Sequence, residues 1–385
     1  FVSLIAPGFV EDNEKMKLAI DLTRITFPFL LLISLASFFS AILNSYNRFA
    51  EAAAAPIILN IILILSLVIS YFLKLDFAKQ LSYGVTLAGI IQFLFLIFFT
   101  RKYYKPSLEF KINLTNKVKF FFSKLLPSIL SSGVTQINIL IGTIIASFES
   151  GAVSYLYYAD RIYQINLALA GIAVGTVSLP VLSNAFKQKN ISMISKIQSK
   201  SIELSILLSI PASVGLVIAS DQIVSALFGY GSFTLENVQL TSLALKFFGY
   251  GIPAFALIKI LSNFFFARNN TKTPFFISCF VVSLNILLSV SLFSKYGFVI
   301  IPIATSISTW TGVLIYIFIL NKKNSLLLKK YLIGNFIKIT LITIIMTFIL
   351  VFALDFFASY LDYDYKYKSI YLLLIVGFVA SFYLI

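Results

Sequence analysis

Residues 24–43 read RITFPFLLLISLASFFSAIL, and Arg24 is the single charged side chain in this run of twenty residues. A helix of about 20 apolar residues crosses the roughly 30 Å hydrocarbon core of a bilayer. In water the same run would expose a large apolar patch, which soluble proteins avoid. The stretch therefore predicts a membrane-spanning helix.

Similar runs recur along the chain, and we expect about eleven membrane-spanning helices. Hydrophobic residues make up 59% of the 385 residues and charged residues 12%, about half the roughly 25% usual in soluble domains. The runs are too long for membrane strands, so the sequence predicts an all-α integral membrane protein. The expected spans are 24–43, 56–74, 81–99, 123–147, 165–185, 201–219, 240–266, 274–294, 297–320, 333–357 and 369–385.

Charges between the predicted spans alternate in sign, which tests the span assignment. The loop at 100–119 has six Lys or Arg against one Glu, and the loops at 186–200 and 321–332 have four Lys each without an acid. The loops at 148–160 and 220–239 are acidic. Because cytoplasmic loops collect Lys and Arg, the basic loops are expected inside. The net charge of +15 then reflects topology, and no nucleic-acid partner is expected.

An internal repeat relates residues 28–67 to residues 253–292 without a gap. Pro28 aligns with Pro253, and Asn60 aligns with Asn285, among twelve identities in forty positions. By the loop charges both copies begin outside, which indicates a parallel repeat of the kind found in secondary transporters. The two repeated prolines can bend their helices, so Pro28 and Pro253 are candidate hinges for alternating access.

Polar residues within the predicted spans are candidate substrate contacts, because burying them in lipid is costly. Lys259 lies inside the span 240–266, and we expect it to face a cavity. Arg24 opens its span beside Asp21, where snorkelling or an ion pair is an alternative to substrate binding. Asn60 and Asn285 are expected to form interhelical hydrogen bonds, with substrate contact as the second interpretation.

Asp160 and Arg161 form a second candidate site, just before an apolar helix rich in small residues. Neighbours on a helix point apart, so each is expected to pair with another residue. An arginine can hold a diphosphate through two parallel hydrogen bonds, whereas a structural ion pair is the plainer alternative. Physical reasoning alone leaves both open.

The sequence lacks the residues and motifs that most enzymes use for catalysis. There is no His, and Cys279 is the single Cys, so a thiolate or histidine metal site is not expected. The spans hold no paired carboxylates, and no Gly-rich phosphate loop is present. We expect no catalytic residue, no metal and no cofactor, with the membrane potential or an ion gradient as the energy source.

Several motifs, in order along nearly the whole chain, resemble the MurJ/MviN family of lipid II flippases within the MATE-like exporter (MOP) superfamily. No single motif is specific, but their order and spacing are. The motifs are APGF at 6–9, RITFPFLLLISLA at 24–36, AILN at 41–44, APIILN at 55–60, YYADR at 157–161, GIAVGT at 171–176, LFGYGSFT at 227–234 and KTP at 272–274.

The resemblance implies fourteen helices in two pseudo-symmetric lobes. Against that plan we expect a chain truncated at both ends, with 1–119 from the first lobe, 120–320 as the second and 321–385 as two extra helices. The family's cavity arginine at the start of its eighth helix matches Arg161. Some members bind sodium with the help of a carboxylate, but the helix holding Asn285 has none, so sodium is not expected.

The resemblance also implies the function. A monomer in the bacterial cytoplasmic membrane would move lipid II from the inner to the outer leaflet by alternating access, with lipid II and membrane lipids as its partners. A flippase for another polyprenyl-diphosphate-linked glycan, or a multidrug exporter of the MATE type, is the alternative. A membrane glycan polymerase would need catalytic carboxylates or His on a large outer loop, and the predicted loops are short.

Overall fold

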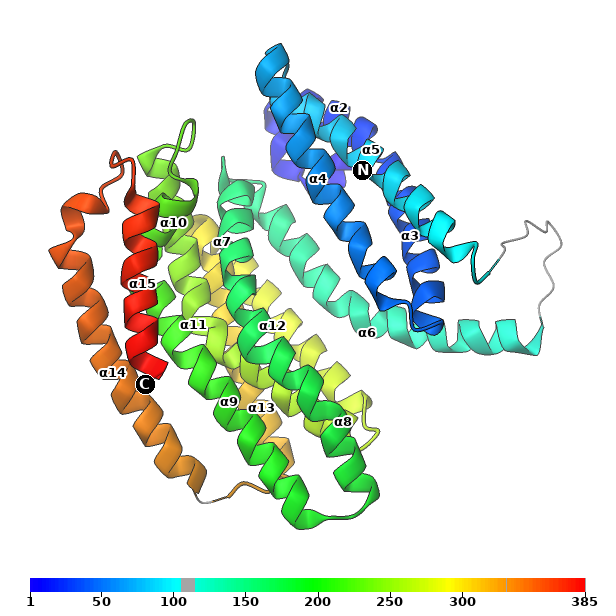
Figure 1. Ribbon diagram of the computed structural model, residues 1–385, viewed down its shortest axis with the longest axis vertical. Coiled ribbons are helices and arrows are strands. Elements are labelled where there is room, and N and C mark those ends of the chain that lie inside the picture. Colours follow the sequence, from blue (N-terminus) through cyan, green and yellow to red (C-terminus); the bar gives the residue numbers. More distant parts are fainter. Residues whose placement is uncertain (105–114, 330, 385) are drawn as a thin grey trace. The chain divides into compact units, whose positions relative to one another are not determined.

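The computed structural model describes residues 1–104, 115–329 and 331–384, and every regular element in these ranges is a helix (Figure 1). The chain forms two compact units, Phe1–Lys124 and Leu125–Ile385. The expected boundaries at 119/120 and 320/321 stay predictions.

Unit 1 is a small bundle in which α5 packs along both α3 and α4. Its core comprises Ala36, Phe39, Leu43, Ala55 and Leu96. The elements are α1 (Val2–Ile5), η1 (Pro7–Glu11), α2 (Asn13–Thr26), α3 (Pro28–Ser45), α4 (Phe49–Leu73), α5 (Phe77–Thr100) and the first residues of α6 (Asn116–Ala146).

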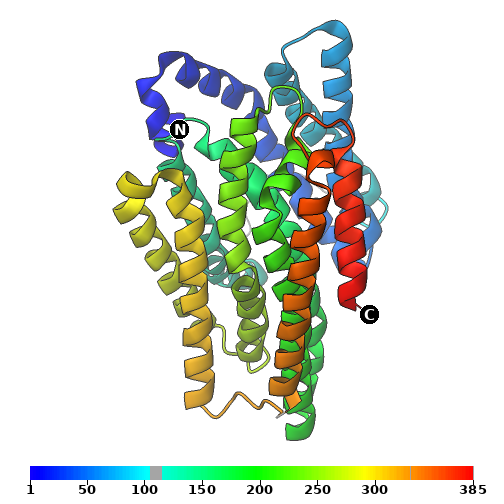
Figure 2. The ribbon, with the colours of Figure 1, turned by 90° about the vertical axis from the view of Figure 1, so that its left-hand side faces the viewer.

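Unit 2 is built around one helix, α11, which packs against α7, α9 and α13 and is buried along much of its length (Figure 2). The appended pair α14 and α15 lies against α9 and α10. After α6 the elements are α7 (Ala152–Leu167), η2 (Ala168–Ala173), α8 (Val174–Lys187), α9 (Ile191–Ile218), α10 (Ser220–Phe228), α11 (Leu235–Phe266), α12 (Lys272–Tyr296), η3 (Gly297–Val299), α13 (Ile300–Lys322), α14 (Tyr331–Phe356), η4 (Ala358–Tyr360) and α15 (Lys368–Leu384).

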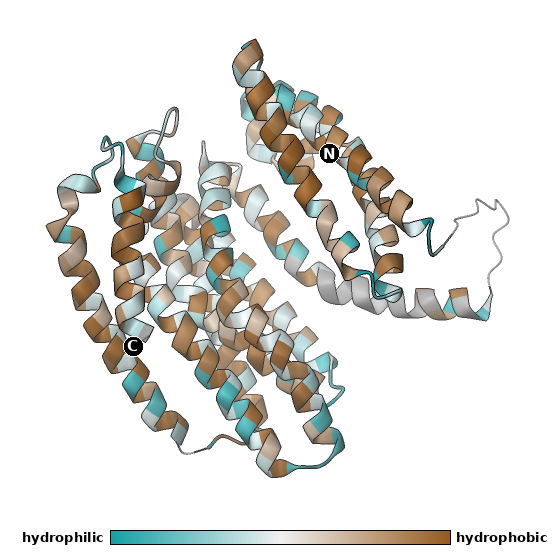
Figure 3. Cartoon of the chain, viewed as in Figure 1, coloured by the Kyte–Doolittle hydropathy of each residue, from teal (hydrophilic) through white to brown (hydrophobic). Residues whose placement is uncertain are grey.

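The membrane character of the helices is confirmed. Among the described residues, eight helical stretches are long and apolar enough to cross a membrane, and one of them, Lys272–Lys322, contains both α12 and α13. Hydrophobic residues, brown in Figure 3, occur along the helices, and many large apolar side chains are exposed, as a lipid solvent permits. Each predicted span overlaps a helix, whereas the count of eleven crossings stays a prediction.

Some predicted loops are wrong, because the helices begin before their apolar runs. The loop expected at 148–160 is helical from Ala152 onward, and the loop expected at 220–239 contains α10. Polar capping residues set the starts of α9 and α11, which also lie inside expected loops: the side chain of Asn190 accepts a hydrogen bond from the Met193 N–H, and Thr234 caps α11 in the same way. Hydropathy detects the apolar part of a helix and misses its polar first turns.

A glycine sets the close approach of α5 to α3 in unit 1. A Cβ placed on Gly89 would lie 2.7 Å from a ring carbon of Phe29 and 3.2 Å from the Cβ of Leu32. In contrast, a Cβ on Gly215 of α9 has no atom within 4 Å. Both glycines lie in helix interiors, so they form a matched pair that differs in packing.

We expect Gly89→Ala to lower the melting temperature of the purified protein in detergent, because overpacking a helix contact costs about 1–3 kcal/mol. Gly215→Ala should leave the melting temperature unchanged or raise it, since Ala is a better helix former by about 1 kcal/mol. Equal melting temperatures for the two variants would contradict the packing described for α3 and α5.

Candidate functional site

Arg161 lies on an exposed stripe of α7. Its guanidinium carbon is 4.6 Å from the ring centre of Tyr157, one turn earlier, and both side chains are exposed, as is Gln164 one turn later. Asp160 is partly buried and accepts a hydrogen bond from the Gln164 amide. Asp160 and Arg161 thus use different partners, as the helix geometry predicted, and the guanidinium keeps hydrogen-bond donors available for an anion.

The opposite face of α7 fixes this stripe in place. The ring of Tyr163 stacks on Phe248 of α11 at 5.3 Å with an interplanar angle of 14°, and it also contacts Phe255. The hydroxyl of Tyr155 lies 3.1 Å from the side-chain oxygen of Asn237 on α11. With α7 held along α11 by its aromatic residues, Arg161 faces away from that contact.

Lys259 is exposed on α11, but at a different level of the bundle from Arg161. The η2–α8 region follows α11, since Gly171 lies against Ala256 and the Gly175 carbonyl accepts a hydrogen bond of 2.8 Å from Asn263. Lys259 is therefore level with residues near 173. At 1.5 Å per residue it lies roughly 18 Å from Arg161 along the helix axis. The structure does not gather the two cations into one cluster.

The helix carrying Arg161 is interrupted by a π-helical turn, η2, at Ala168–Ala173. A Cβ on Gly171 in this turn would lie 3.1 Å from the backbone Cα of Ala256, so the turn and α11 are in close contact. The small residues noted in this part of the sequence permit such a close approach, but nothing in the sequence indicated the π-helical turn. Such turns are frequent at functional sites.

Asn285 forms the interhelical hydrogen bonds expected of a membrane asparagine. Its amide nitrogen lies 2.9 Å from the side-chain oxygen of Asn138 on α6 and 3.1 Å from the Thr305 hydroxyl on α13. Its oxygen accepts a hydrogen bond of 3.1 Å from Ser289. This neutral network ties α6, α12 and α13 together. Asn60, the matching residue of the repeat, is exposed on α4.

Pro253 lies inside the continuous helix α11 and deprives the Gly249 carbonyl of its helical donor. The hydroxyl of Ser213 on α9 supplies a replacement hydrogen bond of 2.7 Å. Two residues of α13 bond to neighbouring carbonyls: Ser306 to Phe247 at 2.7 Å and the Trp310 indole to Tyr250 at 3.0 Å. Side chains of two other helices thus stabilise the turn before Pro253.

In unit 1, a side chain from another helix likewise bonds to a backbone carbonyl just before Pro28. There the hydroxyl of Thr86 on α5 donates to the carbonyl of Ile25, three residues before the proline. Trp310 bonds to the carbonyl three residues before Pro253, so both repeats place a donor from a later helix at the same position. Phe27 between α2 and α3 keeps helical backbone angles, with φ −55° and ψ −40°, and α3 begins at Pro28. The repeat seen in the sequence therefore extends to hydrogen bonding.

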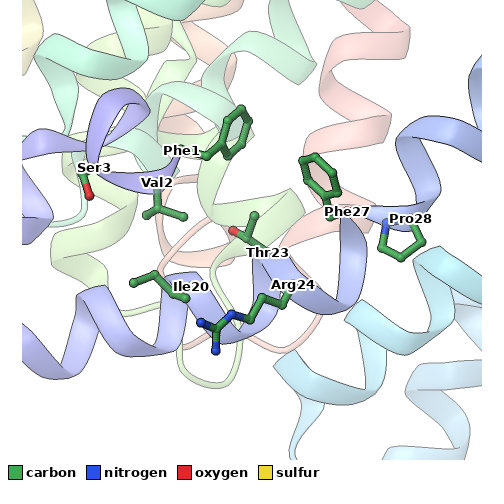
Figure 4. A pocket seen from close by; sticks show the side chains of 8 residues that line it. All are labelled: Phe1, Val2, Ser3, Ile20, Thr23, Arg24, Phe27 and Pro28. Atoms are coloured by element: carbon green, nitrogen blue, oxygen red, sulfur yellow. The ribbon is translucent and has the colours of Figure 1, made fainter.

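Arg24 lines an open pocket of about 450 Å³ in unit 1. The rings of Phe1 and Phe27 meet edge to face with their centres 6.1 Å apart, and Figure 4 shows the Arg24 guanidinium turned away from both. The Arg24 side chain is 78% exposed and lies 3.7 Å from Asp21. Such an exposed ion pair contributes little to stability. The expected pair is present, and the guanidinium stays accessible.

Sequence reasoning did not single out Lys368, the last residue before the expected span 369–385. The structure buries this side chain to 1% exposure at the start of α15. Its ammonium donates to the carbonyls of Gly229 at 2.7 Å and Tyr363 at 2.6 Å, and the rings of Tyr230 and Tyr363 flank it at 4.5 Å. Lys368 therefore anchors α15 to the turn between α10 and α11.

The fold is that of a polytopic transporter. An inward-facing multidrug resistance transporter of the MATE family has a similar structure, with a TM-score of 0.70, 15% identity, and 84% of this chain and 77% of that chain covered. A solved lipid II flippase MurJ in an inward closed conformation is more similar, with a TM-score of 0.81, 27% identity, and 99% of this chain and 76% of that chain covered.

Sequence comparison gives the family. The family model for the lipid II flippase MurJ matches residues 1–371, and the chain belongs to this family. A probable lipid II flippase MurJ of Rhizobium tropici is 38% identical over 311 residues, which are 80% of this chain and 58% of the relative. One of Vibrio cholerae is 30% identical over 377 residues, 96% of this chain and 71% of the relative.

The chain spans about 58–60% of the length of the three curated relatives that match it first. Family membership and the apolar helices make it a multi-pass protein of the cytoplasmic membrane. The family consists of transporters rather than catalysts.

The two matched asparagines of the repeat test the network around Asn285. We expect Asn285→Ala to destabilise the protein by about 1–2 kcal/mol, because it leaves Asn138, Ser289 and Thr305 without a shared partner. Asn60→Ala, at the exposed position, should change the melting temperature little. Thermal unfolding of both variants in detergent measures this, and an equal effect at both positions would show that the Asn285 network does not stabilise the fold.

Proposed function

We propose that this protein moves lipid II from the inner to the outer leaflet of the cytoplasmic membrane by alternating access. The family match over residues 1–371 is the observation that carries the proposal. An exposed guanidinium at Arg161, on a stripe fixed by aromatic packing, supports it. The protein is proposed to act as a monomer, without a metal or cofactor.

The diphosphate of the substrate is the group that Arg161 is suited to bind. A guanidinium presents planar, paired donors that match phosphate oxygens, and burial of the complex strengthens such charged hydrogen bonds. Asp160 is already bonded to Gln164, so it does not neutralise the arginine. Lys259, at another level of unit 2, is proposed to meet the substrate at a different stage of its passage. Arg24 is proposed as a further contact in unit 1, and Asn60 as a polar one.

The proposed conformational change uses the repeated prolines. Pro28 and Pro253 each interrupt helical hydrogen bonding, and side chains of other helices stabilise the freed or neighbouring carbonyls. Such side-chain bonds can exchange without exposing a bare carbonyl to lipid. The membrane potential is the proposed energy source, because a displaced charge couples to it at about 2.3 kcal/mol per 100 mV.

Complementation tests the substrate and Arg161 together. In a bacterium depleted of its own lipid II flippase, the gene for this protein should restore the lipid II that reaches the outer leaflet, measured by its cleavage with an added lipid II-degrading toxin. Arg161→Ala should lower the cleaved fraction at least tenfold, since losing a charged hydrogen bond to phosphate costs about 1.5–3 kcal/mol. Arg161→Lys should retain part of the activity.

Lys187→Gln, an exposed lysine at the end of α8, serves as the control and should behave as the unmodified protein. Membrane levels of every variant are measured by immunoblot. No restoration despite normal levels would reject lipid II and favour another polyprenyl-diphosphate-linked glycan or a drug as substrate. Full activity of Arg161→Ala would reject Arg161 as a substrate contact but would leave lipid II as the proposed substrate.

Pro253→Ala tests the hinge. It returns an N–H donor to the Gly249 carbonyl, so α11 should become stiffer and the protein at least as stable as before. We expect the flipping rate in the toxin assay to fall several-fold while the melting temperature stays equal or rises. A normal rate with an unchanged melting temperature would exclude Pro253 as a hinge.

A further inference from the structure

An apolar pocket lies at one end of unit 2, apart from the residues discussed above. It has a volume of about 440 Å³ and lies among α9, α11, α13 and the connection to α14. Ligand pockets commonly have volumes of 300–1,000 Å³. Seven of the eight lining side chains are aliphatic, and Asn321 is the polar one: Ile202, Ile206, Leu257, Leu261, Ile317, Asn321, Leu326 and Leu328.

The connection between α13 and α14 is fixed as one wall of this pocket. The buried amide of Gln198 donates to the Ser325 carbonyl at 3.2 Å and accepts from the Leu327 N–H at 2.9 Å. Arg268 also donates to the Ser325 carbonyl, at 2.7 Å. These bonds hold the backbone on both sides of Leu326, so the wall is formed before any ligand arrives.

Lysines adjoin two lining residues of the pocket along the chain. Lys322 and Lys323 follow the lining residue Asn321 directly, and Lys329 follows the lining residue Leu328. The nearby acid, Glu203, lies 3.3 Å from Lys200 and also accepts a hydrogen bond from Asn335, so it is neutralised locally. An aliphatic cavity beside lysines matches an amphiphile with an apolar chain and an anionic head.

The position of the pocket indicates where this amphiphile comes from. The α8–α9, α11–α12 and α13–α14 connections lie at the same end of unit 2, and each carries Lys or Arg (Figure 1). Basic connections lie on the cytoplasmic side, where the leaflet is rich in anionic lipid. Basic pockets between membrane helices on this side bind anionic lipid head groups.

We propose that this pocket binds one anionic phospholipid of the cytoplasmic leaflet. An acyl chain lies against Leu257, Leu261 and Ile317, and the phosphate lies beside Lys322, Lys323 and Lys329. A free phosphate ion would use only the lysines and leave the aliphatic walls unoccupied. The lining residues differ from the substrate contacts proposed above: Leu257 and Leu261 flank Lys259 in the chain, but side chains two positions apart on a helix point in different directions.

Photocrosslinking tests the site in the purified full protein. The probe is a phosphatidylglycerol with a diazirine near the end of one acyl chain, in nanodiscs of phosphatidylcholine, with adducts mapped by peptide mass spectrometry. Adducts should concentrate on the pocket-lining residues. Unlabelled phosphatidylglycerol should displace the probe, whereas added phosphatidylcholine should not.

Matched variants separate the pocket from ordinary lipid contact. Lys322→Gln and Lys323→Gln should each lower crosslinking about fivefold, the ratio expected for one lysine near an anionic surface. Lys187→Gln and Lys189→Gln, at the same end of unit 2, should not. Ile317→Trp should fill the pocket and remove the adducts, while Phe318→Trp, on the neighbouring exposed position, should leave them.

Three results would overturn the proposal. One is uniform labelling of the exposed helix faces, and another is equal displacement by phosphatidylcholine. The third is stronger displacement by a polyprenyl phosphate than by phosphatidylglycerol, which would assign the pocket to the substrate's tail. If Ile317→Trp lowers the melting temperature, its loss of adducts reports misfolding. The proposal is then tested by crosslinking of the Lys322 and Lys323 variants and by the competition with unlabelled lipids.

Discussion

Within a bilayer no water can replace a missing hydrogen bond, so every backbone carbonyl at membrane depth needs a donor from the protein. This constraint explains why helices are the only regular elements in the described residues. It also explains the treatment of Pro253, whose ring removes the donor of the Gly249 carbonyl in the most buried helix of unit 2. Ser213 supplies that donor from α9, and α13 bonds to two carbonyls of the same turn. The turn before Pro253 is thereby bonded to α9 and α13.

The same constraint connects the candidate site with the fold. The exposed stripe with Arg161 exists because the other face of α7 is occupied by aromatic contacts to α11. The π-helical turn that follows lies against Ala256, just beyond Pro253. The π-helical turn η2 therefore lies against α11 close to the turn that Pro253 deprives of a hydrogen bond. These two turns are the elements through which the proposed hinge at Pro253 would move Arg161.

Two sets of polar side chains in unit 2 differ in the partners they have. Asn285, Lys368 and Gln198 are buried with their hydrogen bonds made inside the protein, so they hold helices and connections together. Arg161 and Lys259 are exposed and can accept an external anion. Burying a polar group without a partner is costly, so the partnered groups stabilise the fold, whereas the accessible charges are the ones proposed to bind substrate.

The sequence by itself determined the membrane class, the helical spans, the repeat and the family, because twenty-residue apolar runs, loop charges and ordered motifs are local or one-dimensional signals. It also identified Arg161, Asn285 and the two prolines as residues of interest. Only the tertiary structure decided which polar residues form hydrogen bonds between helices and which are exposed. Asn60 and Asn285 are equivalent in the alignment, yet one is exposed and the other is bonded to three side chains. The separation of Lys259 from Arg161, the burial of Lys368 and the apolar pocket beside the lysines were likewise outside the reach of the sequence, because each depends on contacts between residues far apart in the chain.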